Sequence, residues 1–201
     1  IATAPCILQL IENSQITLED KASKFLPELT GDPNKSRITI RHLLTHTSGL
    51  LPGIRKGYDW SGIHTGIALA CSEPSIGHAG YEHRYSDINF ILLGEIVSRV
   101  TGKPLSAFAQ ETIFDPLQMK DTFFHPAETY LPRIAPTTMM DDGSVLKGVV
   151  HDPTAGAMAG EAGHAGLFTS AHDLARFARM ILQGGQLEGA RILRPETVKL
   201  M

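Results

Sequence analysis

The sequence predicts a mainly helical segment with few strands. Residues 88–99 carry apolar side chains at the spacing of one helix face, and residues 171–182 form a second clear helical stretch. The alternation of apolar and polar residues that is typical of half-buried strands is scarce. Residues 50–84 and 115–165 are rich in Gly and Pro and show neither period, and long loops inside compact domains often line functional sites.

Length and composition are typical of one globular domain with a hydrophobic core. The chain has 201 residues, of which 42% are hydrophobic and 19% charged, so it is too apolar for disorder. A net charge of -3 without a basic run gives no reason to expect nucleic acid as a partner, and no apolar run is long enough to span a membrane. Cys6 and Cys71 cannot make a disulfide framework or a four-cysteine zinc site, and we expect both to be buried small hydrophobes.

Both ends of the chain suggest a segment of a longer protein. The chain opens at Ile1 without a Met start or the charged-then-apolar pattern of a signal peptide. It closes on residues 194–201, where a helical pattern begins without a stop signal. We therefore expect residues 1–201 to form a single incomplete domain.

The first half of the chain is expected to hold short capped helices. An apolar helix is predicted over residues 6–12. Thr17, with Asp20 three residues later, is expected to cap a short helical turn, because a hydroxyl and a carboxylate at this spacing can satisfy free backbone amides. Thr39 is expected to cap a helix over residues 40–46 in the same way.

The second half contains the stronger helical signals. The helix over residues 88–99 should stop at Gly102, and a shorter helix should cover residues 105–114. The helix over residues 171–182 should be capped by a hydroxyl from residues 169–170. Two clear helices and scarce strand patterns make this half mainly helical.

Five stretches resemble the serine β-lactamase-like family, which includes class C β-lactamases, penicillin-binding proteins and family VIII-type esterases. The stretches are ITIRHLLTHTSGL at 38–50, YSDINFILLGEIV at 85–97, FDPLQM at 114–119, GHAGLFTS at 163–170 and DLARF at 173–177. Their order and spacing cover nearly the whole chain. The resemblance implies an α+β, β-lactamase/transpeptidase-like fold, in which a central antiparallel sheet packs against a helical region. This chain would supply most of the helical region and few strands.

Members of this family use three active-site elements, and the resemblance places one of them here. A Ser-x-x-Lys on a helix supplies the nucleophile and its activating Lys, since residues three apart share a helix face. A Tyr-x-Asn-type element supplies a phenol that shuttles the proton. Tyr85 and Asp87 match this second element, with Asp where many relatives have Asn. Asp87 is expected to pair with the motif Lys or to cap the helix that follows, because a carboxylate cannot donate an amide N–H.

The nucleophile itself is expected outside this chain. By resemblance, the Ser and Lys fall immediately before Ile1, and the third element falls beyond residue 201. One literal Ser-x-x-Lys occurs at residues 144–147, but the flanking glycines predict a turn and not a helix that enters a core. We therefore expect the isolated chain to be inactive or nearly so.

Four histidines deserve separate interpretations. His164 and Gly166 lie in one glycine-rich turn, which the resemblance places beside the substrate cavity, so both are candidate substrate-binding residues. His164 is expected either to line that cavity or to bond the loop backbone. His42 and His46 stand four apart as in some zinc enzymes, but without a general-base Glu, so helix-end packing is favoured over metal binding. His151 could shape its loop or touch a ligand.

The resemblance implies acyl transfer from an amide or ester, with β-lactams, D-alanyl peptides and small esters as the substrate classes left open. No metal or organic cofactor is expected. The alternatives are a non-catalytic binding module on the same fold and, less favoured, a metal-dependent hydrolase. The resemblance favours the bacterial periplasm or cell exterior, with the cytoplasm left open, and implies a small-molecule or peptidoglycan-like substrate.

Overall fold

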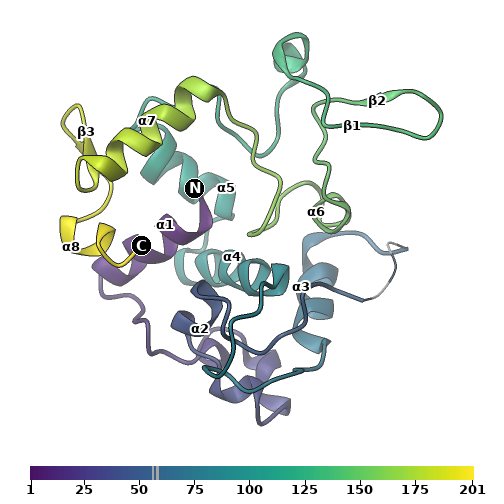
Figure 1. The fold of residues 1–201 in the computed structure, drawn as a ribbon, viewed down its shortest axis with the longest axis vertical. Helices are drawn as coiled ribbons and strands as arrows, with labels where there is room; N and C mark the ends of the chain where they lie inside the picture. The colour runs from purple at the N-terminus through teal and green to yellow at the C-terminus, as the bar shows by residue number, and fades with distance from the viewer. Residues whose placement is uncertain (56, 58) are drawn as a thin grey trace.

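The chain folds as a helical body with two small hairpins, as Figure 1 shows for the computed structural model. The structure describes every residue of the chain except 56 and 58. The α-helices are α1 (Thr3–Glu12), α2 (Ile40–Leu44), α3 (Ile63–Ser72), α4 (Asp87–Thr101), α5 (Leu105–Ala109), α6 (Pro153–Ala157), α7 (Ala171–Leu182) and α8 (Pro195–Val198). The mainly helical prediction with few strands is confirmed.

Shorter helical turns and two antiparallel hairpins complete the fold. The 3-10 helices are η1 (Ala22–Lys24), η2 (Pro27–Gly31), η3 (Lys35–Arg37) and η5 (Glu128–Arg133), and η4 (Gln110–Phe114) is a π-helical turn. One hairpin pairs β1 (Thr138–Met139) with β2 (Val145–Leu146), and the other pairs β3 (Gln186–Leu187) with β4 (Ala190–Arg191). The β1–β2 hairpin projects from the helical body (Figure 1).

Helix α4 is the centre of the core. It packs against α1, α2, α3 and α5, which surround it in Figure 1. Its buried apolar side chains are those of Ile88, Ile91, Leu92, Leu93, Ile96 and Val97. Burial of such a side chain stabilises the fold by about 1.5–3 kcal/mol, so this one helix supplies a large share of the hydrophobic stabilisation. Gly102 ends it in the left-handed conformation, as predicted.

The predicted caps are present at two of the helices. At α2, the hydroxyl of Thr39 accepts the backbone N–H of His42, and the His42 ring accepts the N–H of Thr39. At α7, the Ser170 hydroxyl accepts the N–H of Asp173. Thr17 and Asp20 exchange the same reciprocal bonds, but they close a turn and not a helix.

Three local expectations need correction. Helix α2 ends at Leu44 and not at residue 46, because His46 adopts a left-handed φ of 55° that a helix cannot contain. Helix α3 lies inside the stretch 50–84 that was expected to be irregular; it is held by burial of its face against α4 and α6. Helix α6 interrupts the second expected loop, where Asp152 caps it.

The cysteines and the literal Ser-x-x-Lys behave as expected from the sequence. Both cysteines are free and buried, and burial raises the pKa of the Cys6 thiol to about 12 and that of Cys71 to about 11. Ser144 lies at the β1–β2 turn, where its hydroxyl donates to the Asp142 carboxylate. Within the described part of the chain, no helix has the length and apolar character needed to cross a membrane.

Candidate functional site

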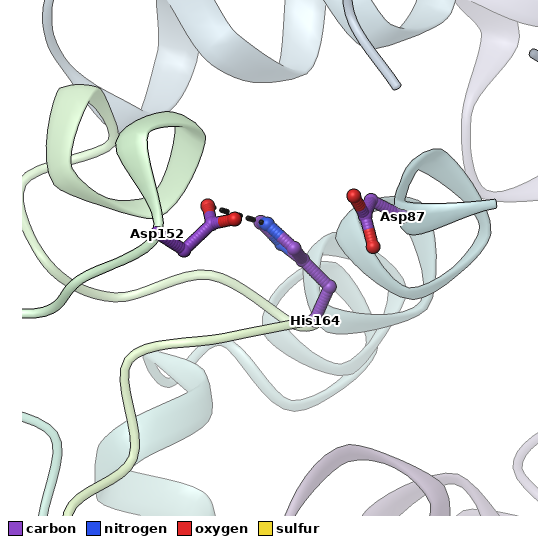
Figure 2. A group of neighbouring side chains, drawn as sticks. All are labelled: Asp87, Asp152 and His164. Atoms are coloured by element: carbon purple, nitrogen blue, oxygen red, sulfur yellow. Dashed lines mark hydrogen bonds and ion pairs between the residues drawn. The ribbon is translucent and has the colours of Figure 1, made fainter. Parts of the chain in front are cut away.

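Asp152 and His164 form the centre of the candidate site. The Nε2 atom of His164 lies 3.0 Å from Oδ1 of Asp152, and the His164 side chain is only 3% exposed (Figure 2). The same carboxylate oxygen accepts the backbone N–H of Ala155 at 2.7 Å, as the cap of α6. The hydrogen bond from His164 holds the pKa of Asp152 below its ordinary value. The pair therefore consists of a charged carboxylate and an imidazole N–H that it orients.

Asp87 joins this pair from the start of α4. One ligand-type atom each from Asp87, Asp152 and His164 lies within 4.8 Å of the others, and Figure 2 shows the His164 ring between the two carboxylates. Among the described residues, this is the one group whose spacing could hold a cation. A cation on Nε2 of His164 would have to replace its hydrogen bond to Asp152, so the geometry is already satisfied as a carboxylate–imidazole pair.

The prediction that Asp87 caps α4 is wrong. Ser86 holds the N-cap position, and Asp87 is the first residue of the helix, with its backbone N–H donated to the Pro52 carbonyl. A carboxylate in the first helical turn is favoured by the positive end of the helix dipole, so Asp87 needs no capping role to be stable there.

Tyr85 stands at the entrance of the same helix. Its side chain is 60% exposed, and its ring lies 4.7 Å from the ring of His46. Hydrogen bonding to the Asp87 carboxylate raises the pKa of the Tyr85 phenol, because the negative charge opposes formation of a phenolate. In this chain, Tyr85 is therefore a poor base by itself, unlike the activated phenol that the resemblance implies.

His46 positions Tyr85, a role that the sequence did not reveal. Its Nδ1 atom accepts the backbone N–H of Ser86 and the side-chain N–H of Asn89, at 3.3 and 3.0 Å. The Ser48 hydroxyl in turn donates to the Asn89 amide oxygen. Burial is the main cause that lowers the pKa of His46, so its ring is held neutral. In the sequence, the only indication of a role for His46 was that it begins the HTS stretch within residues 38–50.

His42 and His46 do not share a helix face, because α2 ends before His46. His42 lies in the capping box of α2, whereas His46 lies beyond the end of that helix and contacts Tyr85 and Phe90. Their ring nitrogens serve different backbone and side-chain partners. The helix-end role favoured from the sequence describes His42.

A cavity of about 880 Å³ opens beside the pair. Asp152, His164, Gly166 and His151 line it, together with Ile1 at the start of the chain. Tyr85 and Asp87 are not among the described residues of its wall. The structure thus places both residues predicted for substrate binding at a cavity large enough for a small organic substrate.

The loop that carries His164 is held by close backbone contacts. A Cβ at position 163 would lie 1.8 Å from the Phe90 carbonyl oxygen, so only glycine fits against α4 there. Gly166 has a φ of 110°, and a Cβ on it would lie 2.3 Å from the Gly160 carbonyl oxygen. The Thr3 hydroxyl donates to the Gly163 carbonyl at 2.6 Å, which fastens the start of α1 to the same loop.

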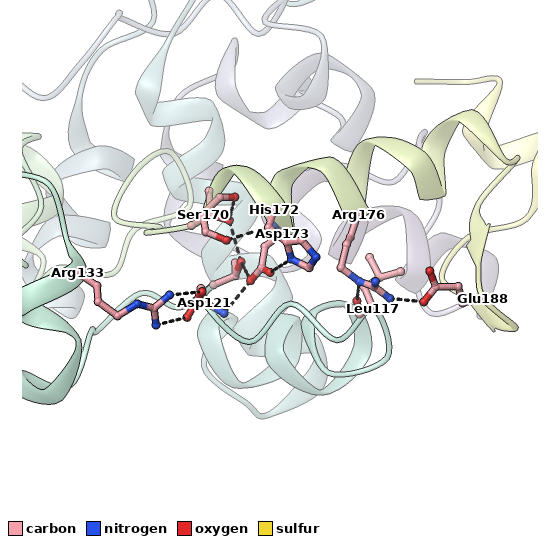
Figure 3. Close-up of polar contacts among 10 residues, drawn as sticks. Leu117, Asp121, Arg133, Ser170, His172, Asp173, Arg176 and Glu188 are labelled. Atoms are coloured by element: carbon pink, nitrogen blue, oxygen red, sulfur yellow. Dashed lines mark hydrogen bonds and ion pairs between the residues drawn. The ribbon is translucent and has the colours of Figure 1, made fainter.

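A buried carboxylate supports the far wall of the cavity. Asp173 of α7 accepts the backbone N–H of Asp121 and the hydroxyl of Thr122, at 2.7 and 2.9 Å (Figure 3). Asp121 also pairs with Arg133, and both of these residues line the cavity. The Asp of the DLARF stretch therefore has a structural role, because its hydrogen bonds attach the cavity wall to α7.

Comparison with known proteins finds matches over nearly the whole chain. A family model described as Beta-lactamase matches residues 2–201. The chain is 30% identical to an N-acetylmuramyl-L-alanine amidase of Bacillus subtilis, over 99% of this chain and 51% of that protein. It is 29% identical to an Escherichia coli protein provisionally named a D-alanyl-D-alanine carboxypeptidase, over 99% of this chain and 52% of that protein.

Solved structures show the same fold. A class C β-lactamase from Rhodobacter sphaeroides matches with a TM-score of 0.76 at 20% identity, over 98% of this chain and 52% of that one. Simvastatin synthase from Aspergillus terreus matches with a TM-score of 0.72 at 27% identity, over 100% of this chain and 52% of that one. The β-lactamase/transpeptidase-like fold expected from the resemblance is confirmed. The chain spans about half the length of the curated relatives that it matches.

Proposed function

This chain belongs to the β-lactamase family, and on that premise we propose that the whole protein containing it is a serine hydrolase. Its reaction would be acyl transfer: a serine attacks an amide or ester carbonyl, an acyl-enzyme forms, and water releases the acid. The observation that carries the proposal is the meeting of the Tyr85–Asp87 segment with the His164 loop beside a cavity of about 880 Å³.

The proposed nucleophile is a Ser-x-x-Lys in the segment joined to Ile1. Ile1 lines the large cavity, and the Thr3 hydroxyl is hydrogen-bonded to the His164 loop. Residues joined to the N-terminal side of Ile1 would therefore lie at the site. A Lys ammonium from that motif would face the Asp87 carboxylate and could offset its effect on Tyr85. Tyr85 would then shuttle the proton between the serine and the leaving group. Because the proposed nucleophile lies outside residues 1–201, the isolated chain would be inactive.

The proposed substrate is an amide or ester of peptidoglycan-like chemistry. The curated relatives are named for cleavage of muramyl-L-alanine amides and of D-alanyl-D-alanine peptides. The cavity wall offers the polar side chains of Arg133, His151 and Ser170 among apolar ones, which suits a peptide with polar groups. Such a substrate would be met in the bacterial periplasm or at the cell exterior.

The test is covalent labelling followed by intact mass measurement. This chain and the whole protein that contains it are each incubated with a fluorophosphonate and, separately, with penicillin G. The proposal expects a stoichiometric adduct on the whole protein, mapped to a serine before Ile1, and no adduct on residues 1–201 alone. An adduct on Ser144 would overturn the assignment of the nucleophile. A whole protein that binds penicillin G without forming an adduct would instead be a non-catalytic binding module.

A further inference from the structure

The pair formed by Asp152 and His164 leaves one imidazole nitrogen unused. Nε2 of His164 is bonded to Asp152, whereas Nδ1 is buried and has no hydrogen-bond partner among the described residues. A buried polar atom without a partner costs free energy, so a natural site that keeps one usually has a ligand or a reaction for it. When Nε2 carries the hydrogen that is donated to Asp152, the neutral tautomer of the ring has its lone pair on Nδ1.

The imidazole lies where the proposed nucleophile would enter. A second cavity of about 180 Å³ is lined by Ile1, Thr3 and His164, together with Phe90 of α4. The Thr3 hydroxyl is bonded to the carbonyl of Gly163, the residue directly before His164. His164 is therefore beside the start of α1, and it also lines the large cavity proposed for the substrate.

The charges around the ring suit a proton acceptor. Two acidic side chains lie beside His164 among the described residues, Asp152, which caps α6, and Asp87, in the first turn of α4. The hydrogen bond between Nε2 and the Asp152 carboxylate holds the ring in place while it carries a transferred proton.

We propose that His164 is the base that activates water for release of the acyl group, with Asp152 as its positioning residue; this rests on the proposed function. Nδ1 of His164 takes a proton from water as the water oxygen bonds to the acyl carbonyl carbon. When the bond between that carbon and the serine oxygen breaks, the imidazolium returns the proton to the serine oxygen. The products are the free acid and the restored serine.

The test separates acylation from deacylation in the whole protein. His164→Gln keeps an amide N–H that can reach Asp152 but removes the basic nitrogen. Acylation is measured as the rate of fluorophosphonate labelling, and deacylation as decay of the acyl adduct formed by p-nitrophenyl acetate or penicillin G. We expect the labelling rate of His164→Gln to be within about threefold of wild type and its deacylation rate to be about 10²–10⁴-fold lower. The acyl adduct should then accumulate and be detected by mass spectrometry. His125→Gln, an exposed histidine outside this site, is the matched control and should deacylate as wild type does.

Asp152→Asn gives a second and independent measurement. Without the Asp152 carboxylate, the imidazolium of His164 is less stable. The acid limb of the pH profile of the deacylation rate should therefore move to lower pH. A merely structural role of Asp152 would not produce this shift. If H164Q deacylates within threefold of wild type, or loses acylation and deacylation equally, the inference is overturned. If H164Q does not fold, an unchanged profile in D152N overturns it. A wild-type whole protein that forms no adduct overturns the proposed function and, with it, this inference.

Discussion

At the scale of single residues, Asp87 decides the chemistry of Tyr85. An Asn at this position would offer an uncharged amide, whereas the carboxylate places a negative charge beside the phenol. The pKa of Tyr85 is raised by this neighbour, and the neutral ring of His46 on its other side supplies no compensating positive charge. Among the described residues, none supplies a positive charge that lowers the pKa of Tyr85, and the proposed Lys would fill that role.

Replacement of Asp87 by Asn should lower the pKa of Tyr85 toward its ordinary value of about 10, because the phenolate no longer meets a carboxylate. The measurement is a phenolate absorbance titration, in which Tyr85→Phe identifies the share that belongs to Tyr85. Asp141→Asn, an exposed change at the β1–β2 turn, should leave that titration unmoved. A Tyr85 titration that is the same in D87N and wild type would show that Asp87 does not control the phenol.

At the scale of elements, α7 holds the cavity wall through one buried side chain. Asp173 is 2% exposed and accepts from a backbone amide and a hydroxyl in the segment before η5. The helix itself is fixed locally by its Ser170 cap. Its attachment to the wall is a tertiary interaction, since Asp121 and Thr122 lie more than fifty residues away in the sequence.

Asp173→Ala should reduce the free energy of unfolding by about 2–4 kcal/mol, because two donors lose their buried acceptor. Urea denaturation followed by circular dichroism measures this loss. Asp141→Ala removes an exposed carboxylate and should change the stability by less than about 0.5 kcal/mol. Equal stability of the two variants would contradict the supporting role of Asp173.

At the scale of the whole molecule, Gly163 joins three segments that are distant in sequence. Its backbone lies against Phe90 and Gly94 of α4, and its carbonyl accepts the Thr3 hydroxyl of α1. The position of His164 relative to Asp87 depends on this close approach. The candidate site is therefore assembled by the packing of α1, α4 and the 162–166 loop together.

Gly163→Ala should reduce the free energy of unfolding by about 1–3 kcal/mol, because the added methyl group overlaps the Phe90 carbonyl and the loop must move. Gly31→Ala is the matched control, since nothing lies within 4 Å of a Cβ placed there. Denaturation midpoints of the two variants and wild type give the comparison. A Gly163→Ala protein as stable as Gly31→Ala would mean that the loop is not packed as tightly as these contacts indicate.

Parts of the candidate site could be predicted from the sequence and parts could not. Tyr85, Asp87, His164 and Gly166 were predicted because they lie in motifs that resemble a known family, and the structure brings His164 next to Asp87. The role of Asp152 as the partner of His164 was not predicted. The two residues are twelve positions apart, with α6 and a turn between them, and no local sequence pattern indicates that their side chains meet. His46 was missed as the neighbour of Tyr85 for the same reason.

The sequence by itself determined the helices and caps whose causes are local. The apolar period of α4, its Gly102 stop, the Thr39 and Ser170 caps and the span of α7 follow from interactions within a few residues. Only the tertiary structure decided that α2 ends before His46, that α3 forms inside a glycine-rich stretch, and that Asp152 faces His164. Those outcomes depend on burial and on close approach between distant segments, which local periodicity and capping patterns do not encode.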